Sequence, residues 1–109
     1  MFSCSSDLKQ SSIDWQRWKL DKFACENYRL QTLNQLEENL QVIEEMTEYE
    51  ILGTLGQPDA SELLRRSQKE FNYFLEPGPE CESPSTSPRM LWIRFGAIGN
   101  VSEALIISD

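Results

Sequence analysis

Residues 89–107 read RMLWIRFGAIGNVSEALII and contain two alternating apolar segments separated by a short turn. In residues 89–96 and again in residues 100–107, apolar side chains recur at every second position, which is the period of a half-buried β-strand. Gly96 and Gly99 mark the turn between the two segments. Consecutive strands with a short connection pair antiparallel, so this stretch predicts a β-hairpin.

A further strand is predicted upstream, over residues 69–76, where Phe71, Tyr73 and Leu75 alternate with other residues. The segment 76–89, EPGPECESPSTSPR, is predicted to be a loop, because its prolines cannot donate to a ladder. One face of the resulting sheet is expected to carry Asn72, Phe74, Trp92, Arg94, Ser102 and Ala104, or the opposite set if the register is reversed.

Residues 27–44 predict one continuous helix with Asn27 as its N-cap. Apolar residues recur there at steps of three and four, which places them in one stripe. The stripe consists of Leu30, Leu33, Leu36, Leu40 and Ile43.

A second, shorter helix is predicted over residues 48–55. Thr47 and Glu50 have the spacing of a capping box, in which each side chain accepts a hydrogen bond from the other residue's backbone N–H. Gly56, followed two residues later by proline, predicts the end of the helix. One more helical turn is expected over residues 59–64.

Two helices followed by three strands predict an α+β fold, with the helices packed on a three-stranded antiparallel sheet in the order α-α-β-β-β. We expect a flexible tail over residues 1–12 and a single domain over residues 13–109. The aromatic segment 13–25 is either a short helix or an extended arm laid over the core.

The composition argues against several classes of function. A net charge of −8 repels phosphate backbones and anionic lipids, so we expect neither nucleic-acid nor membrane-surface binding. No apolar stretch is long enough for a membrane span. The chain has no histidine, which removes serine–histidine and cysteine–histidine catalysis and histidine metal sites. We therefore predict no catalytic residue, no metal ligand and no cofactor.

The chain has three cysteines, Cys4, Cys25 and Cys81. A Cys25–Cys81 disulfide would close a loop of 57 residues and, by the chain-entropy estimate, contribute about 4 kcal/mol in an oxidising compartment. The alternative is two ordinary buried thiols. If Met1 is the native start we expect a cytoplasmic protein, and if an export signal has been removed we expect one in the cell envelope.

Two segments are candidate contacts for a protein partner. Trp15 and Trp18 are of the residue type enriched at binding hot spots, although in a small domain such rings also close the core. The loop predicted over residues 76–89 either contacts a partner or is a rigid turn held in place by Cys81. Its candidate residues are Pro77, Gly78, Pro79 and Glu80.

Three segments together resemble the SmpA/OmlA (BamE-like) outer-membrane assembly lipoproteins. They are MTEYEILGTLGQPD at 46–59, FNYFL at 71–75 and LWIRFGAIGNVSEA at 91–104. The resemblance implies the fold of one repeat of the β-lactamase inhibitor protein, with two helices on a three-stranded sheet, and a role without catalysis. The tryptophan block near Cys25 and the EPGPEC loop at 76–81 look more like a group of uncharacterised bacterial proteins.

These observations favour a non-enzymatic protein-interaction module that presents its sheet face or its proline-rich loop. One alternative is an envelope-associated structural domain of an assembly machine, as the resemblance implies. Another is a small-ligand binder or an enzyme that uses carboxylates or Cys81.

Overall fold

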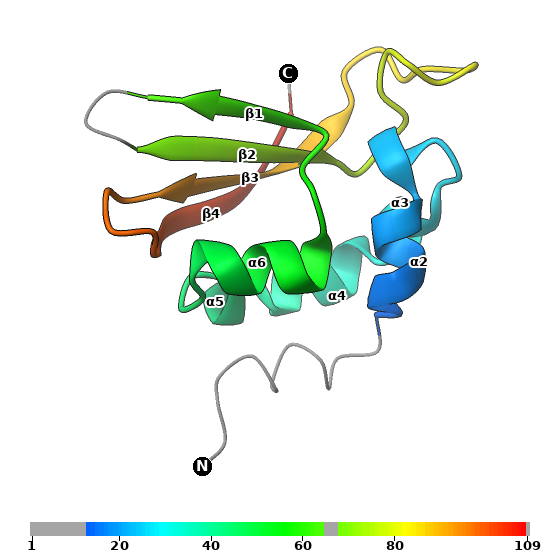
Figure 1. Ribbon diagram of the computed structural model, residues 1–109. Helices are drawn as coiled ribbons and strands as arrows, with labels where there is room; N and C mark the ends of the chain where they lie inside the picture. The colour runs from blue at the N-terminus through cyan, green and yellow to red at the C-terminus, as the bar shows by residue number, and fades with distance from the viewer. Residues whose placement is uncertain (1–12, 65–67, 109) are drawn as a thin grey trace.

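A layer of short helices lies against one face of an antiparallel β-sheet (Figure 1). The computed structural model describes residues 13–64 and 68–108, so the tail expected over residues 1–12 lies outside the described part of the chain. The α+β class predicted from the sequence is confirmed.

The aromatic N-terminal segment is helical. Helix α2, Trp15–Leu20, begins at Asp14, whose carboxylate accepts hydrogen bonds from the backbone N–H groups of Gln16 and Arg17. A 3₁₀-helix η1, Lys22–Ala24, follows. Of the two conformations left open by the sequence, the structure has the short helix.

The prediction of one continuous helix over residues 27–44 is wrong in one respect, because the helix is interrupted at Thr32 and Asn39. Thr32 Oγ1 donates to the carbonyl of Arg29 at 2.8 Å, and Asn39 Nδ2 donates to the carbonyl of Gln35 at 2.7 Å. Such local side-chain bonds compete with regular helical pairing. The resulting helices are α3, Tyr28–Gln31, α4, Leu33–Glu38, and α5, Leu40–Ile43.

Asn27 precedes α3 as expected, but its side chain makes no capping hydrogen bond. Its backbone is left-handed, with φ of 65°, a conformation that asparagine tolerates better than most residues. Asn27 therefore occupies the predicted N-cap position of α3 and turns the chain into the helix, without the side-chain hydrogen bond of a cap.

Helix α6, Glu48–Leu55, has the predicted bounds and the predicted capping box. The Thr47 hydroxyl accepts from the Glu50 N–H at 3.2 Å, and the Glu50 carboxylate accepts from the Thr47 N–H at 3.0 Å. Gly56 follows with φ of 83°, a value that glycine adopts without strain.

The sheet has four strands instead of the three expected. Residues 60–63, predicted as part of a helical turn, form an edge strand that pairs with the next strand along the chain. Pairing satisfies backbone groups of that neighbour, which outweighs the local helical preference. In the order in which they lie side by side, the strands are β1, Ala60–Leu63, β2, Lys69–Phe74, β3, Arg89–Phe95, and β4, Val101–Ser108.

A β-bulge at Ser102 changes the face predicted for part of β4. Val101 lies opposite Phe95 and Glu103 lies opposite Arg94, so Ser102 has no opposing residue. The extra residue reverses the alternation beyond it. Ala104 is consequently buried toward the helices, where the sequence had placed it on the other face.

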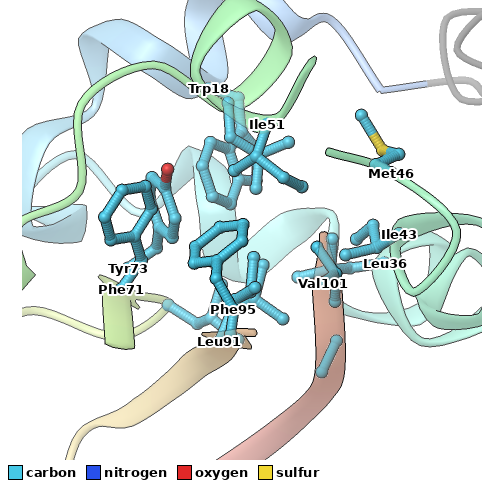
Figure 2. Close-up of a cluster of buried hydrophobic side chains, with 14 of the residues drawn as sticks. Trp18, Leu36, Ile43, Met46, Ile51, Phe71, Tyr73, Leu91, Phe95 and Val101 are labelled. Carbon is cyan, nitrogen blue, oxygen red and sulfur yellow. The ribbon is translucent and has the colours of Figure 1, made fainter. Parts of the chain in front are cut away.

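The core lies between the helix layer and the sheet (Figure 2). Its aromatic centre includes the rings of Phe71 and Phe95, which pack edge to face with centroids 4.8 Å apart. The helical segments contribute the fully buried residues Trp18, Leu36, Ile43, Ile51 and Leu55, and the strands contribute Tyr73, Leu91 and Ile93.

Candidate interaction surface

The face of the sheet opposite the helices carries large apolar side chains from three strands. The register places Asn72, Trp92 and Leu105 in one row across the strands. Phe74, Met90 and Ile107 form the neighbouring row. Leu105 is 41% exposed and the other apolar members are half-buried. We call the five apolar residues the open-face cluster, which consists of Phe74, Met90, Trp92, Leu105 and Ile107.

A third row on this face is charged. Glu70 lies opposite Arg94, and Arg94 lies opposite Glu103. Arg94 Nη2 is 3.1 Å from Glu103 Oε1, and the Arg94 guanidinium carbon is 5.5 Å from the centroid of the Trp92 ring. At the other end of the row, Glu62 lies opposite Glu70, so the signs alternate only from Glu70 to Glu103. The row borders the open-face cluster.

The proline-rich loop closes one end of this face. Gly78 donates its N–H to the carbonyl of Phe23 at 3.0 Å, and a Cβ at Gly78 would lie 3.1 Å from the Phe74 ring. The rings of Phe23 and Phe74 have centroids 6.2 Å apart. The Phe74 end of the open-face cluster is therefore packed, while the Leu105 end is exposed.

The two ends of the loop are joined by Glu76 and Arg89. The Glu76 carboxylate accepts from the Arg89 backbone N–H at 2.9 Å and from its side-chain Nη2 at 3.2 Å. The side-chain hydrogen bond from Arg89, reinforced by the backbone bond, lowers the pKa of Glu76 below its ordinary value.

Cys25 and Cys81 form a disulfide, with their Cα atoms 5.3 Å apart. The bond joins the proline-rich loop to the segment after η1, beside the left-handed residues Phe23 and Ala24, each with φ of 58°. Such backbone conformations cost about 1 kcal/mol or more for residues with a Cβ. The cross-link thus fastens the loop to a segment whose backbone is held in an unfavourable conformation.

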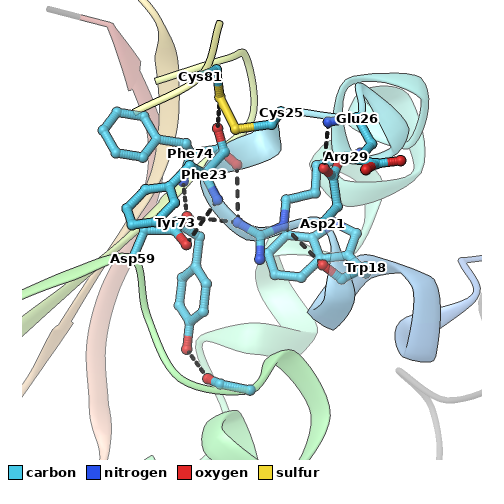
Figure 3. A network of polar contacts seen from close by, with 11 residues as sticks. Trp18, Asp21, Phe23, Cys25, Glu26, Arg29, Asp59, Tyr73, Phe74 and Cys81 are labelled. Carbon is cyan, nitrogen blue, oxygen red and sulfur yellow. Dashed lines mark hydrogen bonds and ion pairs between the residues drawn. A yellow bond between two sulfur atoms is a disulfide. The ribbon is translucent and has the colours of Figure 1, made fainter. Parts of the chain in front are cut away.

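Behind this end of the face lies a buried polar junction centred on Arg29 and Asp59 (Figure 3). Arg29 Nη1 is 2.6 Å from Asp59 Oδ2, and the two side chains are 1% and 3% exposed. Asp59 also accepts from the backbone N–H groups of Phe23 at 3.1 Å and Phe74 at 2.8 Å. One carboxylate therefore joins the N-terminal segment, the residue before β1 and strand β2.

Arg29 makes further contacts within the junction. Its Nε donates to the carbonyl of Trp18 at 2.9 Å, and its guanidinium carbon lies 4.3 Å from the centroid of the Trp18 ring. Asp21 accepts from the N–H groups of Glu26 and Arg29 at 2.7 and 3.0 Å. The sequence did not indicate the buried roles of Arg29, Asp21 and Asp59, because nothing local distinguishes them from surface charges.

Tyr73 borders the junction from strand β2. Its hydroxyl donates to the carbonyl of Gly56 at 2.7 Å. Burial is the main reason that the pKa of Tyr73 is raised far above its ordinary value, so the ring carries no charge near neutral pH. Its role at this position is a structural hydrogen bond that fixes the end of α6.

The structure places the two candidate tryptophans differently. Trp18 is fully buried and contacts Trp15 and Tyr73, with ring centroids 5.4 Å apart in both pairs. Trp15 is half-buried. Trp18 therefore packs within its own domain, which was the alternative to partner contact.

The four candidate loop residues also divide into two kinds. Pro77 and Gly78 are half-buried and buried, and the Pro77 carbonyl accepts from Ser85 N at 2.9 Å. Pro79 and Glu80 are exposed, and the loop to which they belong projects beyond the sheet in Figure 1. The second pair is placed where a partner could touch both side chains directly.

A shallow hollow lies on the other side of the molecule, between α6 and the β3–β4 turn. Tyr49 and Ile98 line it, and both side chains are 86% exposed. Glu48, the charged residue that lines it, is paired with Lys69 at 2.8 Å. Among the described residues, no cluster of titratable side chains lines the hollow.

The described residues show neither a metal-binding cluster nor a membrane-spanning helix. Residues 13–64 and 68–108 contain no group of three or more cysteine and carboxylate side chains placed to hold a metal ion. Within the same ranges, no helix has the length and apolar character needed to cross a membrane.

No family model matches the chain, and neither a curated protein nor a solved structure matches it. The resemblance to the outer-membrane assembly lipoproteins therefore stays a prediction.

Proposed function

We propose that the chain is a non-enzymatic protein-interaction module that binds its partner through the open-face cluster. The observation that carries the proposal is the placement of large apolar side chains from three strands on the face opposite the helix layer. Patches of this kind on a folded domain mark interaction sites.

The composition of the face supports this function. Aromatic residues, methionine and arginine are the residue types enriched in the centres of protein interfaces. Phe74, Met90, Trp92 and Arg94 supply all of these types within two neighbouring strands. Because strands β2 and β3 are paired along their lengths, these side chains are held in place before binding, which lowers the entropic cost of association.

The charge of the chain indicates the kind of partner. The net charge is −8, and the charged row contributes Glu62, Glu70 and Glu103 against a single arginine. A protein surface that combines apolar side chains with lysine or arginine would match both features. The exposed loop residues Pro79 and Glu80 are proposed as flanking contacts to the same partner.

The proposal is tested by photo-cross-linking in cells that naturally express the protein. A benzophenone amino acid replaces Leu105 in one variant and Gln41, exposed on α5, in a matched control. We expect a discrete cross-linked partner from position 105 only, with a yield about tenfold lower when Trp92→Ser is added, as for loss of a binding hot spot. Equal products from both positions, or none from position 105, would exclude this face as the binding surface.

A second candidate, an envelope-associated structural domain, is favoured by the Cys25–Cys81 disulfide. Disulfides persist in oxidising compartments and are rare in the reducing cytosol. The test is alkylation of the protein in intact cells, followed by peptide mass spectrometry. We expect Cys25 and Cys81 to resist alkylation until reductant is added, and direct alkylation of both would remove this candidate.

A further inference from the structure

The two edges of the sheet differ in how well they are protected from pairing with another strand. Edge strands are commonly protected by shortness, charge, proline or bulges. β1 has four residues, all exposed, and includes Glu62. β4 has eight residues, contains no proline or glycine, and has Glu103 as its only charged residue.

At the start of β4, the outer edge of the strand already pairs with another segment of the same chain. The rest of this edge is available for pairing. Val101 N–H donates to the carbonyl of Met46 at 3.0 Å, and Thr47 forms an isolated bridge with Asn100. Beyond the Ser102 bulge, the ladder partners of β4 among the described residues all belong to β3. The outward backbone groups of residues 103–108 therefore form an edge to which a strand can be added.

We propose that the partner adds an extended segment to the β4 edge as a fifth strand. This inference rests on the proposed interaction function and specifies how the partner binds. Strand addition uses backbone hydrogen bonds for affinity and alternate side chains for specificity. The rows of the open face end at Glu103, Leu105 and Ile107, so an added antiparallel strand would continue each of them.

The side chains at the ends of the rows specify the sequence pattern of the added strand. Residues directly opposite each other in an antiparallel pair share a face and interact. A lysine or arginine opposite Glu103 would continue the alternation of Glu70, Arg94 and Glu103, and apolar residues would pack on Leu105 and Ile107. Read from its N-terminus, the added strand has the pattern apolar-x-apolar-x-cation.

A second copy of this chain fits the edge poorly. In a two-fold symmetric antiparallel pair of β4 strands, Glu103 faces either itself or one of the residues that share its face beyond the bulge, Leu105 and Ile107. Like charges opposite each other are destabilising, and an apolar residue leaves the carboxylate without a partner. Two copies that each carry a charge of −8 also repel each other.

The test uses a synthetic peptide in which every second residue is threonine. The residues between the threonines are isoleucine, valine and arginine, in order from the N-terminus. Binding to the full chain is followed by fluorescence anisotropy and by amide hydrogen exchange. We expect saturable binding and new exchange protection at alternate residues of 103–108. No saturable binding up to about 1 mM, or protection in β1 instead, overturns the proposal.

Two N-methylated peptides test the backbone ladder. One peptide is methylated on the backbone nitrogens of its threonines and the other on those of the intervening residues. Each peptide therefore lacks the backbone N–H donors along one edge of its strand. We expect one to lose at least about tenfold in affinity and the other to bind within a factor of about two. Equal affinity for both peptides contradicts strand addition.

A charge exchange tests the pattern. Replacing the peptide arginine by glutamate should weaken binding at least about fivefold, and Glu103→Arg should restore it. Glu62→Arg, on the opposite edge in the same row, is the matched control and should leave the affinity unchanged. If the peptides fail while the position-105 cross-link remains, strand addition is wrong and the interaction function stands.

Discussion

The buried junction around Arg29 and the open-face cluster use charged and aromatic residues in opposite ways. In the junction, Asp59 receives hydrogen bonds from three separate segments, and its ion pair with Arg29 is almost inaccessible to solvent. On the open face, the ion pair between Arg94 and Glu103 is about 40% exposed, and Leu105 contacts solvent. The junction holds the fold together, and the open face is the surface that we propose binds a partner.

The comparison shows why residue type alone does not locate a function. Arg29 stacks on Trp18 and Arg94 lies over Trp92, so each region contains an arginine beside a tryptophan. The first pair is sealed inside the helix layer and the second lies on a solvated sheet face. We expect substitutions in the junction to affect stability, and those on the open face to affect binding.

The largest effect is expected for Asp59→Ala. The substitution leaves Arg29 charged and buried without its partner, which typically costs about 3–5 kcal/mol. Two backbone N–H groups also lose their acceptor, so the upper part of that range is expected. Urea denaturation provides the measurement, with Glu103→Ala in the exposed ion pair as the matched control. A loss for the control as large as that for Asp59→Ala would contradict the comparison.

The next largest effect is expected for removal of the Cys25–Cys81 cross-link. The sequence separation is 56 residues, and release of a loop of this size lowers the free energy of unfolding by about 4 kcal/mol in the chain-entropy model. The measurement compares the wild type with the Cys25→Ser/Cys81→Ser variant, each with and without reductant. Reductant should lower the stability of the wild type and leave that of the double variant unchanged. If reductant also destabilised the double variant, the effect would not come from the Cys25–Cys81 disulfide.

A pair of leucine truncations compares the two faces of the sheet directly. Leu91 is fully buried toward the helices, and Leu91→Ala should cost about 2–5 kcal/mol. Leu105→Ala should cost less than about 1 kcal/mol, because its side chain is partly in water already. Denaturation curves give both values. Similar losses would mean that the open face belongs to the core.

The smallest effect concerns the ion pair at the base of the proline-rich loop. The pKa of Glu76 is lowered by Arg89, so the ionised form is favoured in the folded state. This contribution is present above the unfolded-state pKa, near 4.3, and is lost as the pH falls through the lower folded-state value. The stability difference between wild type and Glu76→Gln should therefore shrink below about pH 4. A difference that grows on acidification would contradict the assignment.

Local signals in the sequence identified the features that depend on neighbouring residues. The Thr47–Glu50 capping box and the bounds of α6 were predicted because all the atoms involved lie within one turn. Asn72, Phe74, Trp92 and Arg94 were placed on a common face because strand alternation is regular in β2 and β3.

Features that depend on distant contacts were not predictable in this way. Arg29 is buried because Asp59, 30 residues away, supplies the opposite charge. Strand β1 forms because β2 has a free edge, although its own residues are all exposed and show no alternation. The Ser102 bulge depends on how β4 meets β3, so the faces of β4 could not be assigned from its own sequence.

The Ser102 bulge also determines where the chain can change its length. Deletion of Ser102 would keep Val101 opposite Phe95 and Glu103 opposite Arg94, the pairs that already exist. Deletion of Ala104 would instead exchange the two faces for every residue that follows, because side chains in a strand alternate with a period of two. Position 102 is thus the place in β4 where a one-residue deletion leaves the inward and outward residues unchanged.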